Sequence, residues 1–118
     1  MFLERLNSIT DRIDGAVALS LVAADGIPVE SVNSDPALDL EVLAAELIAQ
    51  VRVISDDHRE LNVGEVRQLA VSTDRFTLMV ANVAEGYYLL LVLGDSSSYG
   101  RARFELRRAR LLFEPDLT

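Results

Sequence analysis

The segment Ala16–Val32 constrains the fold of this chain more than any other, because it joins an apolar run to a second extended run through a tight turn. The turn contains Asp25-Gly26, a strong β-hairpin signal, since glycine adopts positive φ without steric cost. The first run holds a single polar residue, so both faces of that strand should be covered. The second run contains Pro28, which cannot donate to a neighbouring strand and therefore belongs at a sheet edge. A buried strand beside an edge strand predicts a sheet with helices on both faces.

The remaining sequence alternates between helix-type and strand-type spacing of apolar residues. Asp35 is a plausible N-cap with Pro36 at the first helical position of the second helix, and Pro115 is expected to end the last helix. In chain order we expect a helix Met1–Ile13, strands Ala16–Ala23 and Ile27–Val32, a helix from Leu38 to about Asp57, strands Glu65–Ser72, Phe76–Ala84 and Tyr87–Leu93, and a helix Tyr99–Phe113.

This order, α-β-β-α-β-β-β-α, predicts an α+β three-layer sandwich, with a five-stranded antiparallel sheet between helices on both faces. The last three strands are joined by short turns, which suit antiparallel neighbours. The two most apolar strands, Ala16–Ala23 and Tyr87–Leu93, should lie inside the sheet, and Glu65–Ser72 should lie at the edge opposite the first hairpin. We expect residues 1–118 to form a single domain.

Charge and composition exclude several classes of function. The formal net charge is −8, and all 11 basic residues are arginine. Residues 1–100 hold 6 arginines against 16 acidic residues, which argues against a nucleic-acid binder. No apolar run approaches the roughly 20 residues that span a membrane, and no signal-peptide pattern is present. Without cysteine there is no disulfide framework and no thiolate metal site, so we expect a cytoplasmic protein with no membrane insertion.

No sequence pattern indicates catalysis, so we expect a protein that is not an enzyme and that has no catalytic, cofactor-binding or metal-binding residues. Nucleotide-binding and nucleophile-elbow motifs are absent. The only histidine, His58, is expected to be solvated, and the pair Asp56-Asp57 is a weak signal for a hard cation. The segment Gly94–Ser98 precedes a helix, where helix capping is the expected role and phosphate binding the alternative.

The second helix carries two apolar stripes. One broad stripe should face the sheet, and Val42, Ala45, Ala49 and Val53 form a narrower stripe nearly opposite to it. The narrow stripe is either a solvent face or, because its residues are small, a surface on which another helix packs closely. The last helix is expected to bury Tyr99, Ala102, Leu106, Ala109 and Phe113. Its five arginines lie around the other side, either as a solvated face or as a contact for an acidic partner, a nucleic acid or an anionic membrane.

Gly15-Ala16, the apolar residues Leu19–Val22 and the turn Asp25-Gly26-Ile27-Pro28 resemble the first hairpin of the Roadblock/dynein light chain family. The order and number of elements resemble that family over nearly the whole chain. The resemblance implies a dimer in which the strand at Glu65–Ser72 pairs with its copy, so that one sheet continues across both protomers. It also implies that the second helices of the two protomers pack together on one face.

The family resemblance further implies a platform for a Ras-like small GTPase, with the chain acting as a homodimer. A bacterial member, the polarity and gliding-motility protein, activates its GTPase through the dimer, and the family offers no catalytic arginine to assign here. The alternatives are a scaffold subunit without a GTPase partner and a ligand-sensing module of similar layout. The expected dimer or partner contacts are Val42, Ala45, Glu46, Ala49, Arg52, Val53, Arg67, Leu69 and Val71.

Overall fold

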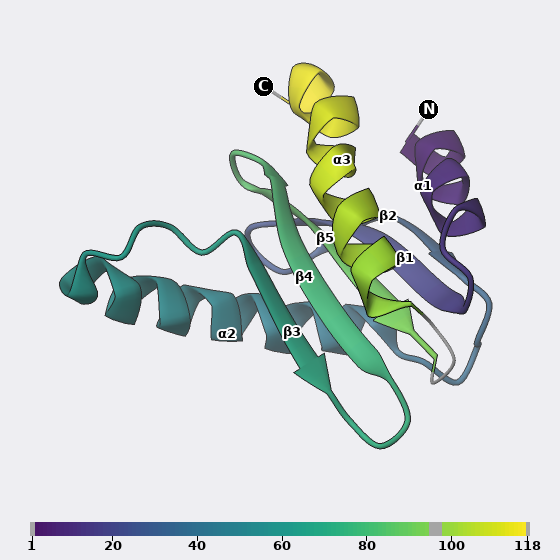
Figure 1. Ribbon diagram of the computed structural model, residues 1–118, viewed down its shortest axis with the longest axis horizontal. Coiled ribbons are helices and arrows are strands. Elements are labelled where there is room, and N and C mark those ends of the chain that lie inside the picture. The colour runs from purple at the N-terminus through teal and green to yellow at the C-terminus, as the bar shows by residue number, and fades with distance from the viewer. Residues whose placement is uncertain (1, 95–97, 118) are drawn as a thin grey trace.

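The computed structural model describes residues 2–94 and 98–117, without the side chains at 57–60. Within these residues three helices accompany one five-stranded sheet (Figure 1). The elements are α1 (Phe2–Asp11), β1 (Ala16–Ala23), β2 (Pro28–Asn33), α2 (Leu40–Leu61), β3 (Gln68–Ser72), β4 (Thr77–Ala84), β5 (Tyr87–Leu93) and α3 (Tyr99–Leu117). The predicted α+β class and element order are confirmed. None of the described helices is both long and apolar enough to cross a membrane.

The strand order in the sheet is β2-β1-β5-β4-β3, and every neighbouring pair is antiparallel. The apolar strands β1 and β5 therefore lie inside the sheet, as predicted, and β2 and β3 form its edges. The one polar side chain of β1, Ser20, is fully buried and shares a hydrogen bond of 2.7 Å with the hydroxyl of Ser31 on β2. This bond satisfies a buried hydroxyl and fixes the pairing of the first hairpin.

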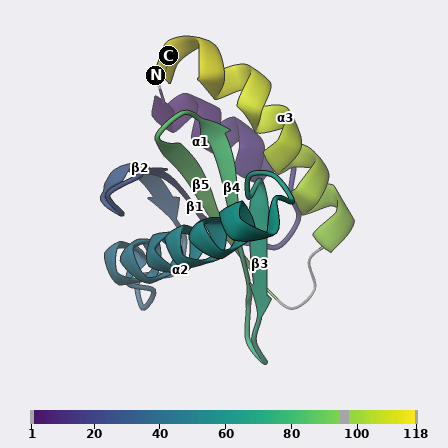
Figure 2. The ribbon, with the colours of Figure 1, turned by 90° about the vertical axis from the view of Figure 1, so that its left-hand side faces the viewer.

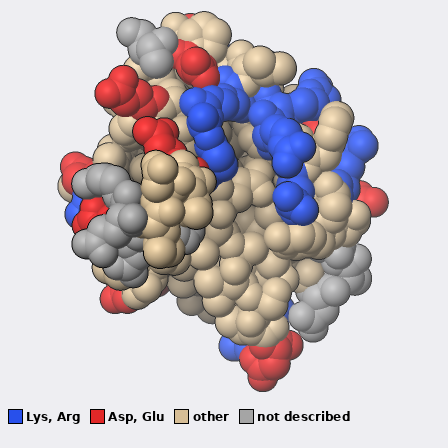
Figure 3. All heavy atoms as spheres, turned by 60° about the vertical axis from the view of Figure 1, so that its left-hand side comes forward, with Lys and Arg blue, Asp and Glu red and all other residues tan. Residues whose placement is uncertain are grey.

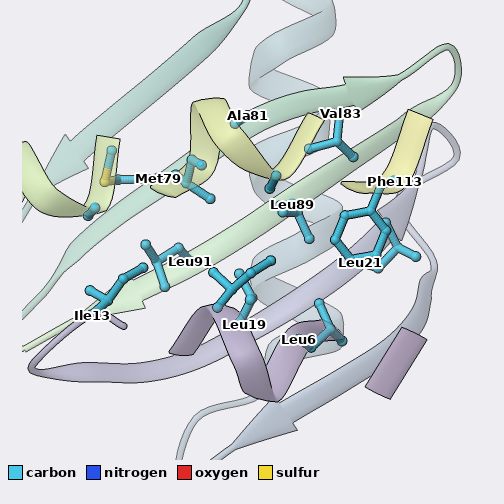
Figure 4. Close-up of a cluster of buried hydrophobic side chains, with 14 of the residues drawn as sticks. Leu6, Ile13, Leu19, Leu21, Met79, Ala81, Val83, Leu89, Leu91 and Phe113 are labelled. Carbon is cyan, nitrogen blue, oxygen red and sulfur yellow. The ribbon is translucent and has the colours of Figure 1, made fainter. Parts of the chain in front are cut away.

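Helices cover both faces of the sheet, with α1 and α3 on one face and α2 on the other (Figure 2). Beneath α1 and α3 the strands contribute alternate residues such as Leu19, Leu89 and Leu91, which pack around Leu6 and Phe113 (Figure 4). The intervening strand residues point toward α2. They pack with the inner side chains of α2, the two sets being Val22, Val80 and Leu90 from the sheet and Ala44, Leu47, Ile48 and Val51 from the helix.

The turn of the first hairpin is seated against α2. Gly26 has φ +88°, and a Cβ built on it would lie 3.2 Å from the Cα of Ala45. The carboxylate of Asp25 accepts a hydrogen bond of 3.0 Å from the backbone N–H of Ile27, which closes the turn. The Asp-Gly pair therefore serves two purposes: it turns the chain, and it lets the turn approach the backbone of α2.

The start of α2 differs from the prediction. The N-cap is Asp39, whose carboxylate accepts a hydrogen bond of 3.2 Å from the N–H of Val42. Asp35 instead accepts a bond of 2.9 Å from the N–H of Ala37 and closes a separate turn that contains Pro36. Both aspartates follow the same local rule, because a carboxylate satisfies a nearby N–H in a turn as well as at a helix start. The helix also continues past the expected end, to Leu61.

Three further expectations at the ends of elements are wrong. The first helix ends at Asp11, before the expected Ile13, and β3 begins at Gln68 instead of Glu65. Before it, the backbone carbonyl of Arg67 accepts one hydrogen bond of 3.0 Å from the N–H of Asn82 on β4. Pro115 does not end α3, which continues to Leu117, and the half-buried side chain of Leu117 packs against the cluster beneath α1 and α3. That packing holds the last turn in place although proline removes one backbone donor.

The buried face of α3 includes a charged residue that the apolar pattern missed. Tyr99, expected in the core, is exposed, whereas Glu105 is only 2% exposed. One Glu105 oxygen lies 3.8 Å from a guanidinium nitrogen of Arg12 and 3.4 Å from one of Arg108. The other oxygen is buried without a hydrogen-bond partner. Glu105 thus places a carboxylate on the buried face of α3, where the helical repeat would lead one to expect an apolar core residue.

The structure describes Ser98, the last residue of the segment expected to cap α3, but not the side chain of Asp57 in the acidic pair Asp56-Asp57. Ser98 accepts a hydrogen bond of 3.2 Å from the N–H of Arg101, so the helix-capping role is confirmed for that residue. Residues 95–97 and the side chains of Asp57 and His58 lie outside the described part of the structure.

Candidate functional site

The outer face of α2 carries the predicted small-residue stripe. Ala45 and Ala49 are exposed, and Val42 and Val53 at its two ends are 55% and 56% exposed. The stripe extends about 16 Å along the helix, given a rise of 1.5 Å per residue. On the opposite side of α2 the broad stripe is buried against the sheet, as expected. A helix that already buries one face presents a second apolar face to its surroundings.

Two of the predicted contact residues also support the first hairpin. Ala45 lies against Gly26, and the absence of a side chain at Gly26 allows the hairpin turn to approach the backbone of α2. The guanidinium of Arg52 donates a hydrogen bond to the backbone carbonyl of Ala24 in the same turn. Glu46 is exposed on the helix surface. The hairpin and the outer part of α2 are therefore held together as one surface.

The edge strand β3 is open on its outer side. Within the described residues β3 pairs only with β4. Leu69 is half-buried and packs against the cluster beneath α2, whereas Val71, two residues further on, is 40% exposed. The strand holds neither proline nor a charged residue, the features that commonly protect an edge. Its unpaired N–H and C=O groups are a template for another strand.

The outer stripe of α2 and the edge of β3 belong to one side of the molecule. In Figures 1 and 2, β3 overlaps α2, and Leu69 packs against the cluster that lies between α2 and the sheet. Six of the nine predicted contacts lie on α2, and two lie on β3. The structure thus brings eight of these residues to the same region of the protein.

Arg67 is placed elsewhere. It precedes β3 and lines a groove of about 540 Å³ between α3 and the connection from α2 to β3. The facing side chains on α3 are Arg103, Arg107 and Arg110. Figure 3 shows arginine side chains gathered around a hollow on this side of the molecule. The spacing of Arg103, Arg107 and Arg110 predicts that they lie on one flank of a helix. Their proximity to Arg67 depends on the tertiary structure, which the sequence pattern does not show.

A second, larger hollow lies on the α2 side of the same connection. This open cleft of about 930 Å³ is lined by polar residues that include Arg52, Ser55, Asn82 and Tyr88. It contains both acidic and basic side chains and therefore has no strong preference for one sign of charge. No group of three or more histidine, aspartate or glutamate side chains among the described residues is placed to hold a metal ion.

The comparisons with known proteins agree with this architecture. Residues 3–93 match the family model of the Roadblock/LC7 domain, and no curated protein matches the chain. A Roadblock/LC7 domain from Streptomyces avermitilis is 20% identical with a TM-score of 0.85, and the match covers 94% of this chain and 92% of that chain. MglC from Myxococcus xanthus is 28% identical with a TM-score of 0.68, covering 94% of both chains. The gliding protein MglB from Thermus thermophilus is 19% identical with a TM-score of 0.81, covering 92% of this chain and 82% of that chain. The match over residues 3–93 shows that this chain belongs to the Roadblock/LC7 family.

Proposed function

We propose that this chain, as a single cytoplasmic domain, forms a homodimer that binds and regulates a Ras-like small GTPase without catalytic chemistry of its own. The observation that carries the proposal is the outer stripe of α2, which stays apolar and exposed although the helix already buries its other face. The family resemblance supplies the class of partner. Regulation takes the form of altered GTP hydrolysis or of nucleotide-dependent capture.

The homodimer is supported by two adjoining features that a second copy would cover together. The unpaired edge of β3 offers backbone groups to another strand, and the stripe on α2 offers small side chains to another helix. In a two-fold interface each copy contributes the same patch, so both features would be used twice. Assembly would extend the sheet and bury Val42 and Val53 in one step.

Ala49→Glu tests the dimer, because it places a charge in the middle of the small-residue stripe. Burying an unpaired carboxylate costs about 3–5 kcal/mol, which raises the dimer dissociation constant by roughly 10²–10³-fold or more. Gln50→Glu is the matched control, since Gln50 is exposed on the flank of the same helix. Light scattering at micromolar concentration should give about twice the 13.0 kDa chain mass for the wild type and the control, and 13.0 kDa for Ala49→Glu. An unchanged mass for Ala49→Glu would remove the stripe from the dimer contact.

The GTPase partner is tested with the Ras-like proteins encoded by the same genome, starting with any gene adjacent to this one. Each GTPase is loaded with GDP or with a non-hydrolysable GTP analogue, and binding to the full-length chain is measured by calorimetry. Single-turnover phosphate release shows whether bound GTP is hydrolysed faster. We expect one GTPase to bind in a nucleotide-dependent manner or to change its hydrolysis rate. Failure of every Ras-like protein to bind would refute this function and favour the scaffold alternative.

A ligand-binding role is the second candidate, and the open cleft of about 930 Å³ with its polar lining favours it. Its volume lies within the range of small-molecule sites. Arg52→Ala removes a lining side chain and its bond to the hairpin turn. If the chain were a ligand sensor, small molecules extracted from the native source would raise the melting temperature of the wild type and not that of Arg52→Ala. The GTPase measurements would then be negative.

A further inference from the structure

We propose that the groove beside α3 binds an extended acidic segment of a partner protein. This α3 groove is defined by Arg67, Arg103, Arg107, Arg110, Val63 and Val66. The three α3 arginines belong to the helix that packs on the face of the sheet opposite α2. The surface is therefore separate from the small-residue stripe proposed for the dimer and the GTPase.

The groove has positive charge that the described residues do not neutralise. No described carboxylate lies within ion-pair distance of Arg67, Arg103 or Arg107, and only Arg110 has such a partner, Glu114 at 2.9 Å. Of the lining residues one, Glu65, is acidic. Four guanidinium groups thus face a shared hollow in a protein whose net charge is −8. Guanidinium groups prefer carboxylate or phosphate partners, so the missing partner is an anion.

On the other flank of α3, two arginines make polar contacts within the protein. Arg108 contacts the buried carboxylate of Glu105. Arg101 donates a hydrogen bond of 3.3 Å to the backbone carbonyl of Arg12. Both arginines on that flank therefore contact groups of the fold.

On the groove flank Arg110 pairs with Glu114, and the Arg103 guanidinium lies 5.8 Å from the centre of the Tyr99 ring. Among the described residues, Arg67 and Arg107 have no ion pair or ring contact, and an anionic segment in the groove would supply one.

The spacing of the arginines fits an extended chain better than a single small anion. Arg103, Arg107 and Arg110 occupy one flank of α3 over about 10 Å of helix. A single phosphate group would occupy only part of this length. In an extended polypeptide, side chains on one face repeat about every 6.6 Å, which is close to the separation of successive turns of a helix. Alternate acidic side chains would therefore meet successive arginines.

The wall opposite α3 combines polar residues with two valines of the connection from α2 to β3. Val63 is 66% exposed, and Val66 lines the groove as well. Successive side chains of an extended chain point to opposite sides. A segment in which acidic and apolar residues alternate would place carboxylates on α3 and apolar side chains on the valines. A nucleic acid fits less well, because none of the described residues that line the groove is aromatic and could stack on a base.

The test uses a fluorescent decapeptide in which glutamate and valine alternate, with a second peptide of five glutamates followed by five valines. Fluorescence anisotropy measures binding to the full-length chain at 50 mM and 300 mM salt. Arg103→Gln with Arg107→Gln removes two groove arginines. The matched control is Arg75→Gln with Arg101→Gln, which changes the net charge equally at exposed positions outside the groove lining. Thermal melts establish that both variants fold.

We expect the alternating peptide to bind the wild type, more weakly at the higher salt concentration. The groove variant should raise the dissociation constant about tenfold, and the control variant less than twofold. The proposal is overturned by equal losses in the two variants or by equal binding of the two peptides. Tighter binding of a ten-nucleotide single-stranded DNA, lost in the groove variant, would overturn it in favour of a nucleic acid.

Discussion

Replacing Gly26 with alanine should destabilise the protein through the contact between the hairpin turn and α2. At φ +88° an L-residue costs about 1–2 kcal/mol, and the less flexible unfolded chain offsets about 0.4–1 kcal/mol of this. The new Cβ would lie 3.2 Å from the Cα of Ala45, in the backbone of a long helix, which cannot rotate away. Forcing one methyl group into a packed site costs about 1–3 kcal/mol more.

Gly86→Ala is the matched control, because Gly86 has φ +79° and a Cβ there would meet nothing within 4 Å. It should show only the conformational cost. The two variants should therefore differ by about 2 kcal/mol in the free energy of unfolding. For a chain of this size 1 kcal/mol lowers the melting temperature by about 3–6 °C, so Gly26→Ala should melt roughly 6–12 °C below Gly86→Ala.

The measurement is thermal unfolding followed by circular dichroism at one protein concentration, because the proposed dimerisation would make the melting temperature concentration-dependent. Urea unfolding gives the free energies independently. If the two variants lose the same stability, the hairpin turn is not seated against α2, and the close approach does not explain the glycine at Gly26.

Three further substitutions separate local causes of stability. Asp39→Ala removes the N-cap of α2 and should cost about 1 kcal/mol in urea unfolding, and an unchanged midpoint would contradict the capping assignment. Glu105→Met replaces a buried carboxylate that has an unpartnered oxygen, so thermal unfolding should show equal or higher stability, whereas a large loss would mean that the ion pairs are net stabilising. Gly100→Ala lies in the first turn of α3, where an added Cβ meets nothing, and should raise stability by about 0.5 kcal/mol; lower stability would show that the site is not open.

Much of the fold could be predicted because its strongest signals are local. The bounds of β1 and β5 match the expected ranges, since each is an apolar run closed by a turn or a polar segment. The edge positions of β2 and β3 also match, because Pro28 and the short connections leave few alternatives. The two faces of α2 follow from the helical repeat alone, and the structure buries one and exposes the other.

The incorrect expectations concern positions where contacts with distant residues, or two competing local rules, determine the structure. Asp35 and Asp39 are both able to cap a helix, and the sequence does not say which N–H each one meets. The buried carboxylate of Glu105 lies near Arg108 of its own helix, three residues later, and near Arg12, whose proximity depends on the tertiary structure. The groove at Arg67 likewise needs the connection after α2 to meet α3, which no periodicity describes.

The open edge of β3 has a consequence for how the protein is produced in a cell. Leu69, Ala70 and Val71 carry no charge and no proline to discourage the wrong strand from pairing there. A newly synthesised copy that folds alone exposes this edge to every other unfinished chain nearby. If β3 pairs with a second copy as proposed, that pairing and aggregation are competing second-order reactions, and a high concentration of new chains speeds both. We therefore expect slow expression at low temperature to increase the yield of folded protein. Each β3 edge then has more time to pair with a folded copy, as proposed, before it meets an unfolded chain.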